Sequence, residues 1–446
     1  MLEKGLVEKT YELLREVSLC DRCLGRQFAF LTTGTNNQER GRSLKWVLAA
    51  SGHQKALADD PEGYQILKIL VEKGDSDVAA GTLQRLGKNF EKTAFSCEIC
   101  RGKLGQIPQF AEKIWSAIGG IDFRSFLVGA RVPSDITEAE DEIKASHHLS
   151  WGESIKSEIS RELGKSLTLI SGKMVDIKKP DLSVVADIFE GRFEVKINPL
   201  FIAGRYRKFI RGIPQATWLC RRCRGKGCEE CAGTGRMYPE SVEELICKPV
   251  VEFTAGSAGK LHASGREDID ARMLGNGRPF VVEVREPRRR AVDLNLLERK
   301  INEAAEGKIE VLDLRRVERS EVRKVKREES SKKVYRAIVV TSKKTSDEDL
   351  AKLERAFSNV IVKQQTPTRV LHRRSDRVRE KQIYEAKAKR LAPKKLELTL
   401  SCQGGLYVKE LVDGDGGRTK PNLSEILGSE ARCSELDVIE VGVGGG

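Results

Sequence analysis

The arrangement of its cysteines restricts the folding of this chain more than any other feature. Eight of the eleven cysteines fall in four Cys-x-x-Cys pairs. Two of these pairs are adjacent and form the run Cys220-x2-Cys223-x4-Cys228-x2-Cys231. Four thiolates at this spacing can close a tetrahedron, the geometry of structural zinc, and the interspersed glycines allow the tight turns that this requires. We therefore predict a zinc knuckle; the alternative is a loop with free thiols.

The other two pairs, Cys20/Cys23 and Cys97/Cys100, are far apart in the sequence. Because both lack a nearer partner, we predict that they share a second zinc ion, the alternative being two independent pairs without metal. Neither set of four contains a histidine, so both zinc ions are expected to be structural. The remaining cysteines are predicted to be core residues: Cys247, Cys402 and Cys433.

The charge balance points to a polyanionic partner. Lys and Arg number 79 against 66 Asp and Glu, a net charge of +13. Such an excess favours nucleic acid over the alternative, a solvated basic face without a partner. No run approaches the ~18 apolar residues of a membrane span, and the N-terminus does not resemble a signal peptide. We therefore expect a soluble, cytoplasmic protein that has no contact with membranes.

Periodicity of apolar residues predicts an α+β, multidomain chain. Helices are expected at Leu6–Val17, Lys45–Ala50, Tyr64–Lys73, Gly152–Leu163, Leu294–Ala305 and Leu350–Phe357. Strands are expected at Phe123–Val132, Leu182–Ile188, Arg192–Ile197, Phe280–Val284, Ile309–Leu314, Tyr335–Val340 and Lys395–Cys402. The charge-dense stretch Glu318–Lys333 is predicted to be either a solvated helix or a mobile basic arm.

Three segments in the C-terminal half carry candidate chemistry. The first, Gly265–Phe280, is loop-like and holds Asp268 and Asp270, although a solvated turn has the same composition. The second places Tyr335 at the start of a strand, where an ordinary core tyrosine is the alternative. The third contains Tyr407 and Lys409, which alternation places on one face of a strand; there the alternative is a lysine that reaches solvent.

Together these segments resemble the pseudouridine synthase superfamily, and most closely its tRNA-specific Pus-ten class in the archaeal form. The stretches Gly265–Phe280, Gln365–Arg374 and Gly414–Asn422 carry the resemblance, which extends over nearly the whole chain. It implies an N-terminal zinc module (1–104), a THUMP-like α/β RNA-binding domain (105–215) and a zinc knuckle insertion (216–238). It also implies a catalytic domain with a mixed, mostly antiparallel sheet flanked by helices (239–441), followed by a disordered tail (442–446).

The resemblance also implies roles for single residues. A catalytic aspartate of the superfamily often follows an arginine with one residue between them, and Arg266-Glu267-Asp268 fits this frame whereas Asp270 does not. Asp268 is therefore the expected nucleophile. Tyr335 is expected to pack on the target base and to take part in proton removal at C5. Lys409, beside Tyr407, is expected to pair with the aspartate. Further basic residues are expected to hold RNA phosphates: Arg205, Arg207, Lys208, Arg369, Arg373, Arg374, Arg377 and Arg379.

The expected activity is the conversion of uridine to pseudouridine in the TΨC arm of tRNA, at conventional positions 54 and 55. This isomerisation needs no catalytic cofactor. The expected partner is tRNA, and no obligate protein partner is implied. One alternative is a THUMP-containing tRNA methyltransferase or thiolation enzyme, although the chain has no P-loop or dinucleotide-type glycine motif. A second alternative is a non-catalytic tRNA-binding protein.

Overall fold

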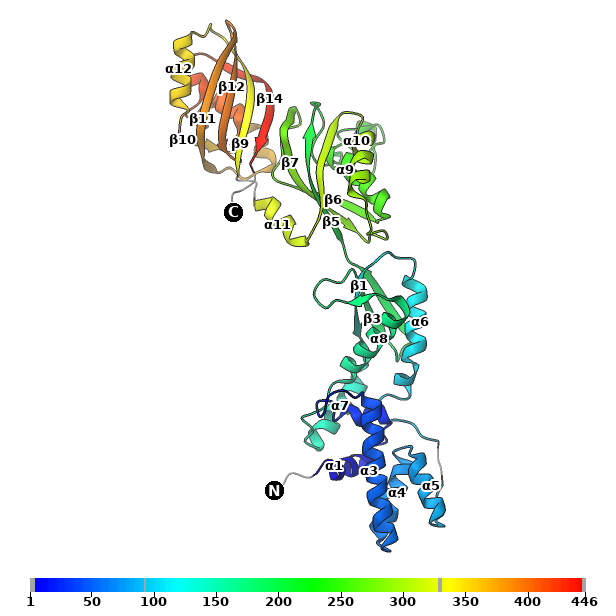
Figure 1. Ribbon diagram of the computed structural model, residues 1–446. Helices are drawn as coiled ribbons and strands as arrows, with labels where there is room; N and C mark the ends of the chain where they lie inside the picture. Colours follow the sequence, from blue (N-terminus) through cyan, green and yellow to red (C-terminus); the bar gives the residue numbers. More distant parts are fainter. Residues whose placement is uncertain (1–4, 92–93, 328–330, 443–446) are drawn as a thin grey trace. The chain divides into compact units, whose positions relative to one another are not determined.

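The computed structural model describes residues 5–91, 94–327 and 331–442, and the chain divides into two units, Met1–Asn198 and Pro199–Gly446 (Figure 1). Within the described residues, no helix combines the length and apolar character needed to cross a membrane. Residues 328–330 of the predicted charge-dense stretch and 443–446 of the predicted tail lie outside these ranges. Gly442 is described, and its N–H donates to the carbonyl oxygen of Lys332.

Unit 1 contains the predicted helices and a small sheet. Its helices are α1 (Leu6–Glu16), α2 (Asp21–Arg26), α3 (Asn37–Leu57), α4 (Pro61–Glu72), α5 (Asp77–Arg85), α6 (Ile107–Ile118), α7 (Ser134–Ser146) and α8 (Ile155–Ser171). Local sequence signals set the helix ends. Asn36 caps α3 and forms a capping box with Glu39, and Gly172 ends α8 in the left-handed conformation.

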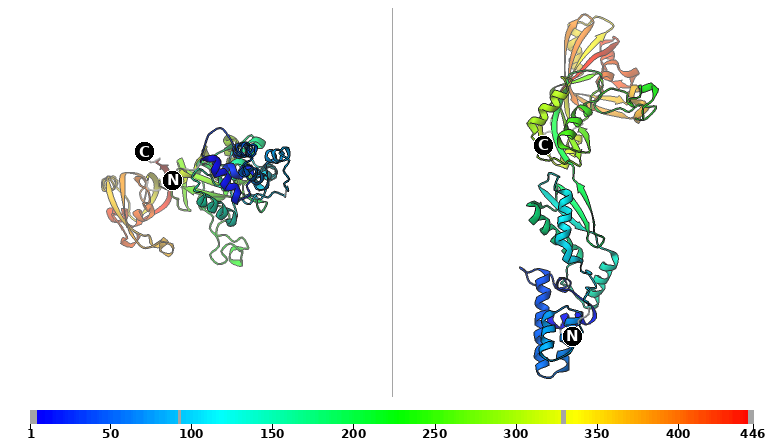
Figure 2. Two further views of the ribbon diagram at one scale, coloured as in Figure 1. Left: turned by 90° about the horizontal axis from the view of Figure 1, so that it is seen from below. Right: turned by 90° about the vertical axis from the view of Figure 1, so that its right-hand side faces the viewer.

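The sheet of unit 1 has the order β2-β1-β3-β4. Its strands are β1 (Ser125–Ala130), β2 (Met174–Val175), β3 (Leu182–Asp187) and β4 (Arg192–Ile197). The predicted strands Leu182–Ile188 and Arg192–Ile197 correspond to β3 and β4, which pair antiparallel as a hairpin. Helices α6 and α8 lie side by side, and α8 packs on β1 (Figures 1 and 2). The sheet and its helices therefore form a compact α/β layer.

The zinc module and the α/β region of unit 1 share one hydrophobic core, which runs from Leu13 to Ile188. A buried ion network joins them as well. Arg26, at the end of α2, is fully buried and contacts Glu140 on α7 (Nε–Oε1, 2.7 Å) and Glu158 on α8 (Nη1–Oε2, 2.9 Å). Removing either carboxylate would take one of its two counter-charges from the buried Arg26, so the two regions stabilise each other.

Unit 2 is built on one long mixed sheet with the order β13-β10-β11-β12-β9-β14-β7-β5-β8, and β6 also pairs with β7. Its strands are β5 (Leu200–Lys208), β6 (Ala258–Ala263), β7 (Ala271–Arg285), β8 (Ile309–Val317), β9 (Lys332–Thr341), β10 (Val360–Gln365), β11 (Val378–Ala392), β12 (Lys395–Gln403), β13 (Thr419–Lys420) and β14 (Ala431–Val441). Among the described strands of unit 2, only β7 and β14 pair in parallel.

Helices cover this sheet over two large hydrophobic cores, and a third, smaller cluster is formed by Phe201, Ala203, Val281 and Val325. They are α9 (Val242–Thr254), α10 (Leu294–Ala304), α11 (Arg319–Arg327), α12 (Asp347–Ala356), α13 (Val408–Asp413) and α14 (Leu423–Leu427). One core lies under α9 and α10, and the other under α12 and α13. Tyr335 packs against both cores, so it marks the place where they meet.

Several sequence expectations are confirmed and some are wrong. On β12, the alternating residues Leu396, Leu398 and Leu400 are all fully buried, as predicted. The charge-dense stretch includes α11, so its described part contains a helix. The segment Gly265–Phe280 is a loop only as far as Asp270, because β7 begins at Ala271.

The division of the chain also differs from the prediction. It falls after Asn198, whereas the predicted second domain runs to residue 215. The difference arises from β5 (Leu200–Lys208), which pairs with β7 and β8 and is therefore a strand of the unit 2 sheet. The knuckle at 220–231 follows β5 and belongs to the same unit.

Candidate active site

The loop between β6 and β7 carries Asp268, and hydrogen bonds from buried polar groups fix its position. Glu267 points away from solvent and accepts hydrogen bonds from the Tyr206 hydroxyl (2.9 Å to Oε2) and from Arg278 Nε (2.9 Å to Oε2). Gln215 Nε2 donates to the Tyr206 hydroxyl (2.7 Å) and to the carbonyl oxygen of Gly265 (3.0 Å). The glutamate and its partners therefore hold the backbone that precedes Asp268.

Lys208 holds the other end of this loop. Its fully buried Nζ donates to the carbonyl oxygens of Ile269 (3.1 Å) and Asp268 (3.4 Å) and lies 3.9 Å from Glu267 Oε1. Burial lowers the pKa of Lys208 below its ordinary value, although the charge of Glu267 opposes this effect. A buried ammonium group that binds loop carbonyls rigidifies the backbone that carries the Asp268 carboxylate.

Asp268 lies between two cations. Arg369, on the 3-10 helix η4 (Thr368–Arg373), approaches it with Nη2 at 3.1 Å from Oδ2 and Nη1 at 3.2 Å from Oδ1. Lys409 Nζ lies 3.4 Å from the same Oδ2. Both cations compensate the charge of the carboxylate, whose side chain keeps 30% exposure and remains accessible to a substrate.

The main partner of Lys409 is a different aspartate. Its Nζ lies 2.7 Å from both carboxylate oxygens of Asp270. Burial raises the pKa of Asp270, but the hydrogen bond and charge of Lys409 outweigh this and the pKa lies below its ordinary value. The closest basic partner of Asp268 is therefore Arg369, a residue that the sequence had suggested as a phosphate ligand.

Arg369 is itself oriented by a buried carboxylate. Its Nε lies 2.5 Å from Oε1 of Glu410, which is almost fully buried on α13. Burial opposes the charged form of Arg369, but Glu410 and Asp268 outweigh it and raise the pKa of Arg369 above its ordinary value. The guanidinium group thus stays charged and bridges two carboxylates.

Tyr407 and Lys409 do not alternate along a strand, so this prediction was wrong. Tyr407 is the N-cap residue of α13 and Lys409 lies in that helix. The backbone of Tyr407 is held by the Gln364 side chain, which accepts from its N–H (2.8 Å) and donates to its carbonyl oxygen (2.9 Å). The helix directs Lys409 to the aspartates, while the Tyr407 hydroxyl accepts a hydrogen bond from Arg374 (2.8 Å).

A cavity of about 110 Å³ opens beside Asp268. Tyr335, Tyr407, Leu406 and Val438 contribute to its wall, so it combines a carboxylate with aromatic and apolar surface. Burial raises the pKa of Tyr335 above its ordinary value. The structure therefore brings three of the predicted residues to one cavity and places the fourth, Lys409, against Asp268.

The basic residues suggested for phosphate binding have mostly structural contacts. Lys208 is buried beneath the loop, Arg207 pairs with Glu310 (2.8 Å), and Arg205 donates to the carbonyl oxygens of Gly277 and Val441. Arg379 donates to the Thr366 hydroxyl. The Arg373 side chain lies outside the described part of the structure. These contacts correct the prediction for Lys208, because a fully buried ammonium group cannot reach a phosphate.

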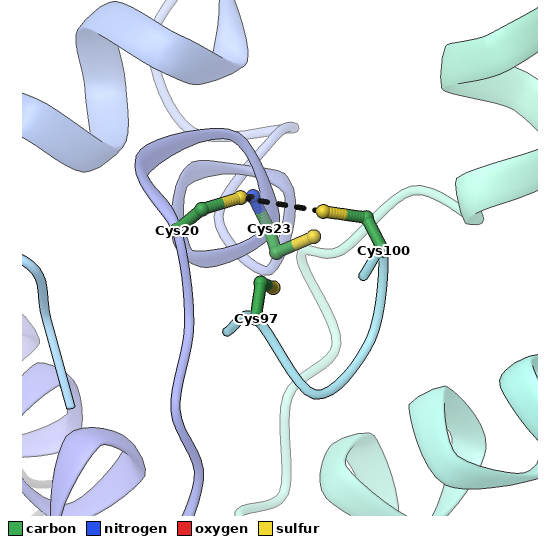
Figure 3. A group of neighbouring side chains, drawn as sticks. All are labelled: Cys20, Cys23, Cys97 and Cys100. Carbon is green, nitrogen blue, oxygen red and sulfur yellow. Dashed lines mark hydrogen bonds between the residues drawn. The ribbon is translucent and has the colours of Figure 1, made fainter. Parts of the chain in front are cut away.

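The N-terminal cysteines meet as predicted (Figure 3). The sulfur atoms of Cys20, Cys23, Cys97 and Cys100 lie within 4.8 Å of one another, and Cys20 and Cys100 are 3.6 Å apart. A tetrahedron with Zn–S bonds of 2.3 Å has S···S edges of roughly 3.8 Å. The group therefore fits a structural zinc ion, and its burial in the core of unit 1 ties that ion to the fold.

The knuckle cysteines form a second group of this kind. The sulfur atoms of Cys220 and Cys228, and those of Cys223 and Cys231, are 3.8 Å apart, again close to the tetrahedral edge. Gly235 has φ +71°, and a Cβ atom there would lie 2.5 Å from the Gly225 carbonyl oxygen. The other cysteines pack in or against the core, as predicted: Cys247, Cys402 and Cys433.

Sequence reasoning missed several residues of the site. It named Glu267 only as a spacer in the Arg-x-Asp frame, and it overlooked Glu410 and Trp218. Trp218 lines a second cavity beside the Asp268 loop. Its position two residues before the first knuckle cysteine, in a chain with only four tryptophans, was the one available signal.

Comparisons with known proteins agree over the whole chain. The family model described as "Pus10, C-terminal" matches residues 201–442, and "Pus10 THUMP domain, archaeal" matches residues 110–187. A tRNA pseudouridine synthase Pus10 from Methanothrix thermoacetophila is 43% identical over 99% of this chain and 95% of its own length. The one from Methanopyrus kandleri is 40% identical over 98% of both. Among solved structures, a Cbf5-Nop10-Gar1 complex shows a slight likeness, with 14% identity, a TM-score of 0.27 and 42% coverage of each chain.

Proposed function

We propose that this protein, which belongs to the Pus10 family, isomerises uridine to pseudouridine in tRNA with Asp268 as the nucleophile. The observation that carries the proposal is the position of Asp268 at the mouth of an aromatic cavity, against Arg369 and Lys409. The full-length likeness to Pus10 tRNA pseudouridine synthases supports it. We place the enzyme in the cytoplasm, where its tRNA substrate is found.

The reaction needs three operations that the described residues can perform. The C–N glycosidic bond must break, the uracil must turn, and its C5 must join the ribose. The Asp268 carboxylate adds to the substrate and leaves again, so the step is covalent catalysis without net hydrolysis or oxidation. Arg369 and Lys409 hold this carboxylate in place and balance its charge in each state.

The target uridine must leave its base stack, which takes a few kcal/mol. The rings of Tyr335 and Tyr407 offer a surface that offsets part of this penalty. Tyr335 lines the cavity, so we assign to it the packing of the base and, as the family resemblance implies, a part in the removal of the C5 proton; N1 of the uracil gains a proton in exchange. We further propose that the targets are the uridines at conventional positions 54 and 55.

Purified protein incubated with unmodified tRNA tests the proposal by pseudouridine mapping. The wild-type protein should form pseudouridine in the TΨC arm without added S-adenosylmethionine or ATP. The Asp268→Asn variant should bind tRNA and form none. Full activity of Asp268→Asn would refute the assignment of the nucleophile, and a strict need for S-adenosylmethionine or ATP would favour methyl transfer or thiolation.

A further inference from the structure

A second cavity adjoins the first on the other side of the Asp268 loop. Its volume is about 240 Å³, more than twice the 110 Å³ of the cavity that holds Tyr335. The two cavities share the walls formed by the loop residues 266–268 and by Arg369.

The wall of the second cavity suits a nucleobase. Trp218 lies at one side, with Pro214, Ala216 and Ile269 as further apolar surface. Aromatic rings of this kind are the common platform on which unstacked bases lie in proteins that bind single-stranded RNA. Asp270 adds hydrogen-bond acceptors: its side chain is 65% exposed and keeps lone pairs beyond those that bind Lys409.

Trp218 is held firmly enough to act as such a platform. Its ring contacts that of Tyr238 edge to face at a centroid distance of 5.8 Å. Its carbonyl oxygen accepts a hydrogen bond from the Met237 N–H (2.9 Å), and the next residue, Leu219, forms an isolated bridge with Arg236. These contacts close the base of the zinc knuckle, so the knuckle fixes the tryptophan at the edge of the active site.

The wall between the cavities carries a cation that is available to RNA. Arg266 lines both cavities, is exposed, and has no ion-pair partner among the residues that the structure describes. A phosphate that links two nucleotides, one in each cavity, would pass this guanidinium group. Two adjoining cavities with a free cation at their common wall fit a dinucleotide better than a single base.

We propose that the Trp218 cavity binds the base of a nucleotide that neighbours the target uridine, stacked on Trp218 and with its N–H groups toward Asp270. The proposal rests on the proposed function, because it takes the Tyr335 cavity as the uridine site. The zinc knuckle then has a role in substrate selection: it carries the side chain that receives the neighbouring base.

A double-mutant cycle between protein and RNA tests the proposal. The dissociation constant of a tRNA arm from the protein is measured for variants that all carry Asp268→Asn, so that no turnover occurs. An abasic site is placed in turn at each of the two nucleotides on either side of the target. At the position that enters the cavity, loss of the base should weaken binding about tenfold with Trp218 present, but less than about twofold with Trp218→Ala.

Two further variants separate stacking from folding. Trp218→Phe should restore most of the affinity, because a phenyl ring still offers a stacking face. Leu296→Ala removes an exposed side chain of α10 that lines neither cavity and should leave binding unchanged. The zinc content of each variant shows whether the knuckle is intact.

The outcomes distinguish this proposal from the proposed function. The proposal fails if, at every abasic position, the fold-loss of affinity caused by Trp218→Ala and that caused by the missing base are independent and multiply. The cavity then does not bind a neighbouring base, even where the wild-type protein makes pseudouridine. If one abasic position shows the coupling while the wild-type protein makes no pseudouridine, the base site stands and the proposed activity fails.

Discussion

Replacing Glu267 by glutamine should destabilise unit 2 strongly, although the side chain keeps its shape. The Glu267 side chain is fully buried and is the counter-charge for Arg278 and Lys208. In the variant, Arg278 and Lys208 stay buried without the negative charge of Glu267. Removing one partner of a buried ion pair decreases the free energy of unfolding by about 3–5 kcal/mol.

This loss converts into a measurable shift in Tm. Unit 2 spans residues 199–446, and for a unit of this size each kcal/mol lowers Tm by about 2–4 °C. The product is a decrease of roughly 6–20 °C. Differential scanning calorimetry measures it, and hydrogen exchange of peptides from β7 assigns the transition to unit 2.

A matched control lies on the neighbouring surface. Glu310→Gln breaks the exposed pair with Arg207 on β5, in which the Glu310 side chain is 42% exposed. Exposed pairs contribute about 0–1 kcal/mol, so Tm should fall by no more than about 4 °C. If Glu267→Gln lowers Tm no more than Glu310→Gln does, the buried network does not hold the loop as argued.

The remaining predictions concern charge, pH and metal. Asp270→Asn should reduce the initial rate of pseudouridine formation without abolishing it, because Arg369 still holds Asp268; complete loss would contradict this. Burial opposes ionisation of Asp437, but three arginines outweigh it and lower its pKa to about 2. Since the ordinary value is about 3.9, its contribution to stability is present above about pH 4 and is lost as pH falls toward 2. Urea unfolding of unit 2 should show this loss, and Asp437→Asn should lack it. Cys23→Ser should unfold unit 1, which circular dichroism measures. Cys223→Ser should disturb only the knuckle. Equal losses of the circular dichroism signal in both variants would contradict this difference between the two zinc sites.

Sequence patterns predicted the elements whose burial follows local periodicity. The strand β12 is an example, since Leu396, Leu398 and Leu400 repeat with the period of a strand and face one core. The same reasoning failed for Tyr407, because the short segment around it fits the start of a helix as well as it fits a strand. The helix prevails because Gln364, more than forty residues earlier, binds both backbone groups of Tyr407.

Lys409 was predicted as a partner of Asp268, but its closest basic partner, Arg369, could not be identified from the sequence. Arg369 lies 101 residues from Asp268, and its local surroundings are those of any surface arginine. The boundary after Asn198 was missed because the strand β5 has partners on β7 and β8 that are distant in sequence. Asp268 itself was predicted from the short frame Arg266-Glu267-Asp268. Its role stays a prediction until the activity of the Asp268→Asn variant is measured.

The place of β14 in the sheet affects when the enzyme becomes competent during synthesis. This strand is translated after every other strand of unit 2, yet it lies between β7 and β9, and Leu436 and Val438 line the cavity beside Asp268. Domains fold in the order in which they leave the ribosome. A nascent chain that has not yet exposed β14 therefore has two unjoined half-sheets and lacks Leu436 and Val438 beside Asp268, so activity requires this strand to have been synthesised.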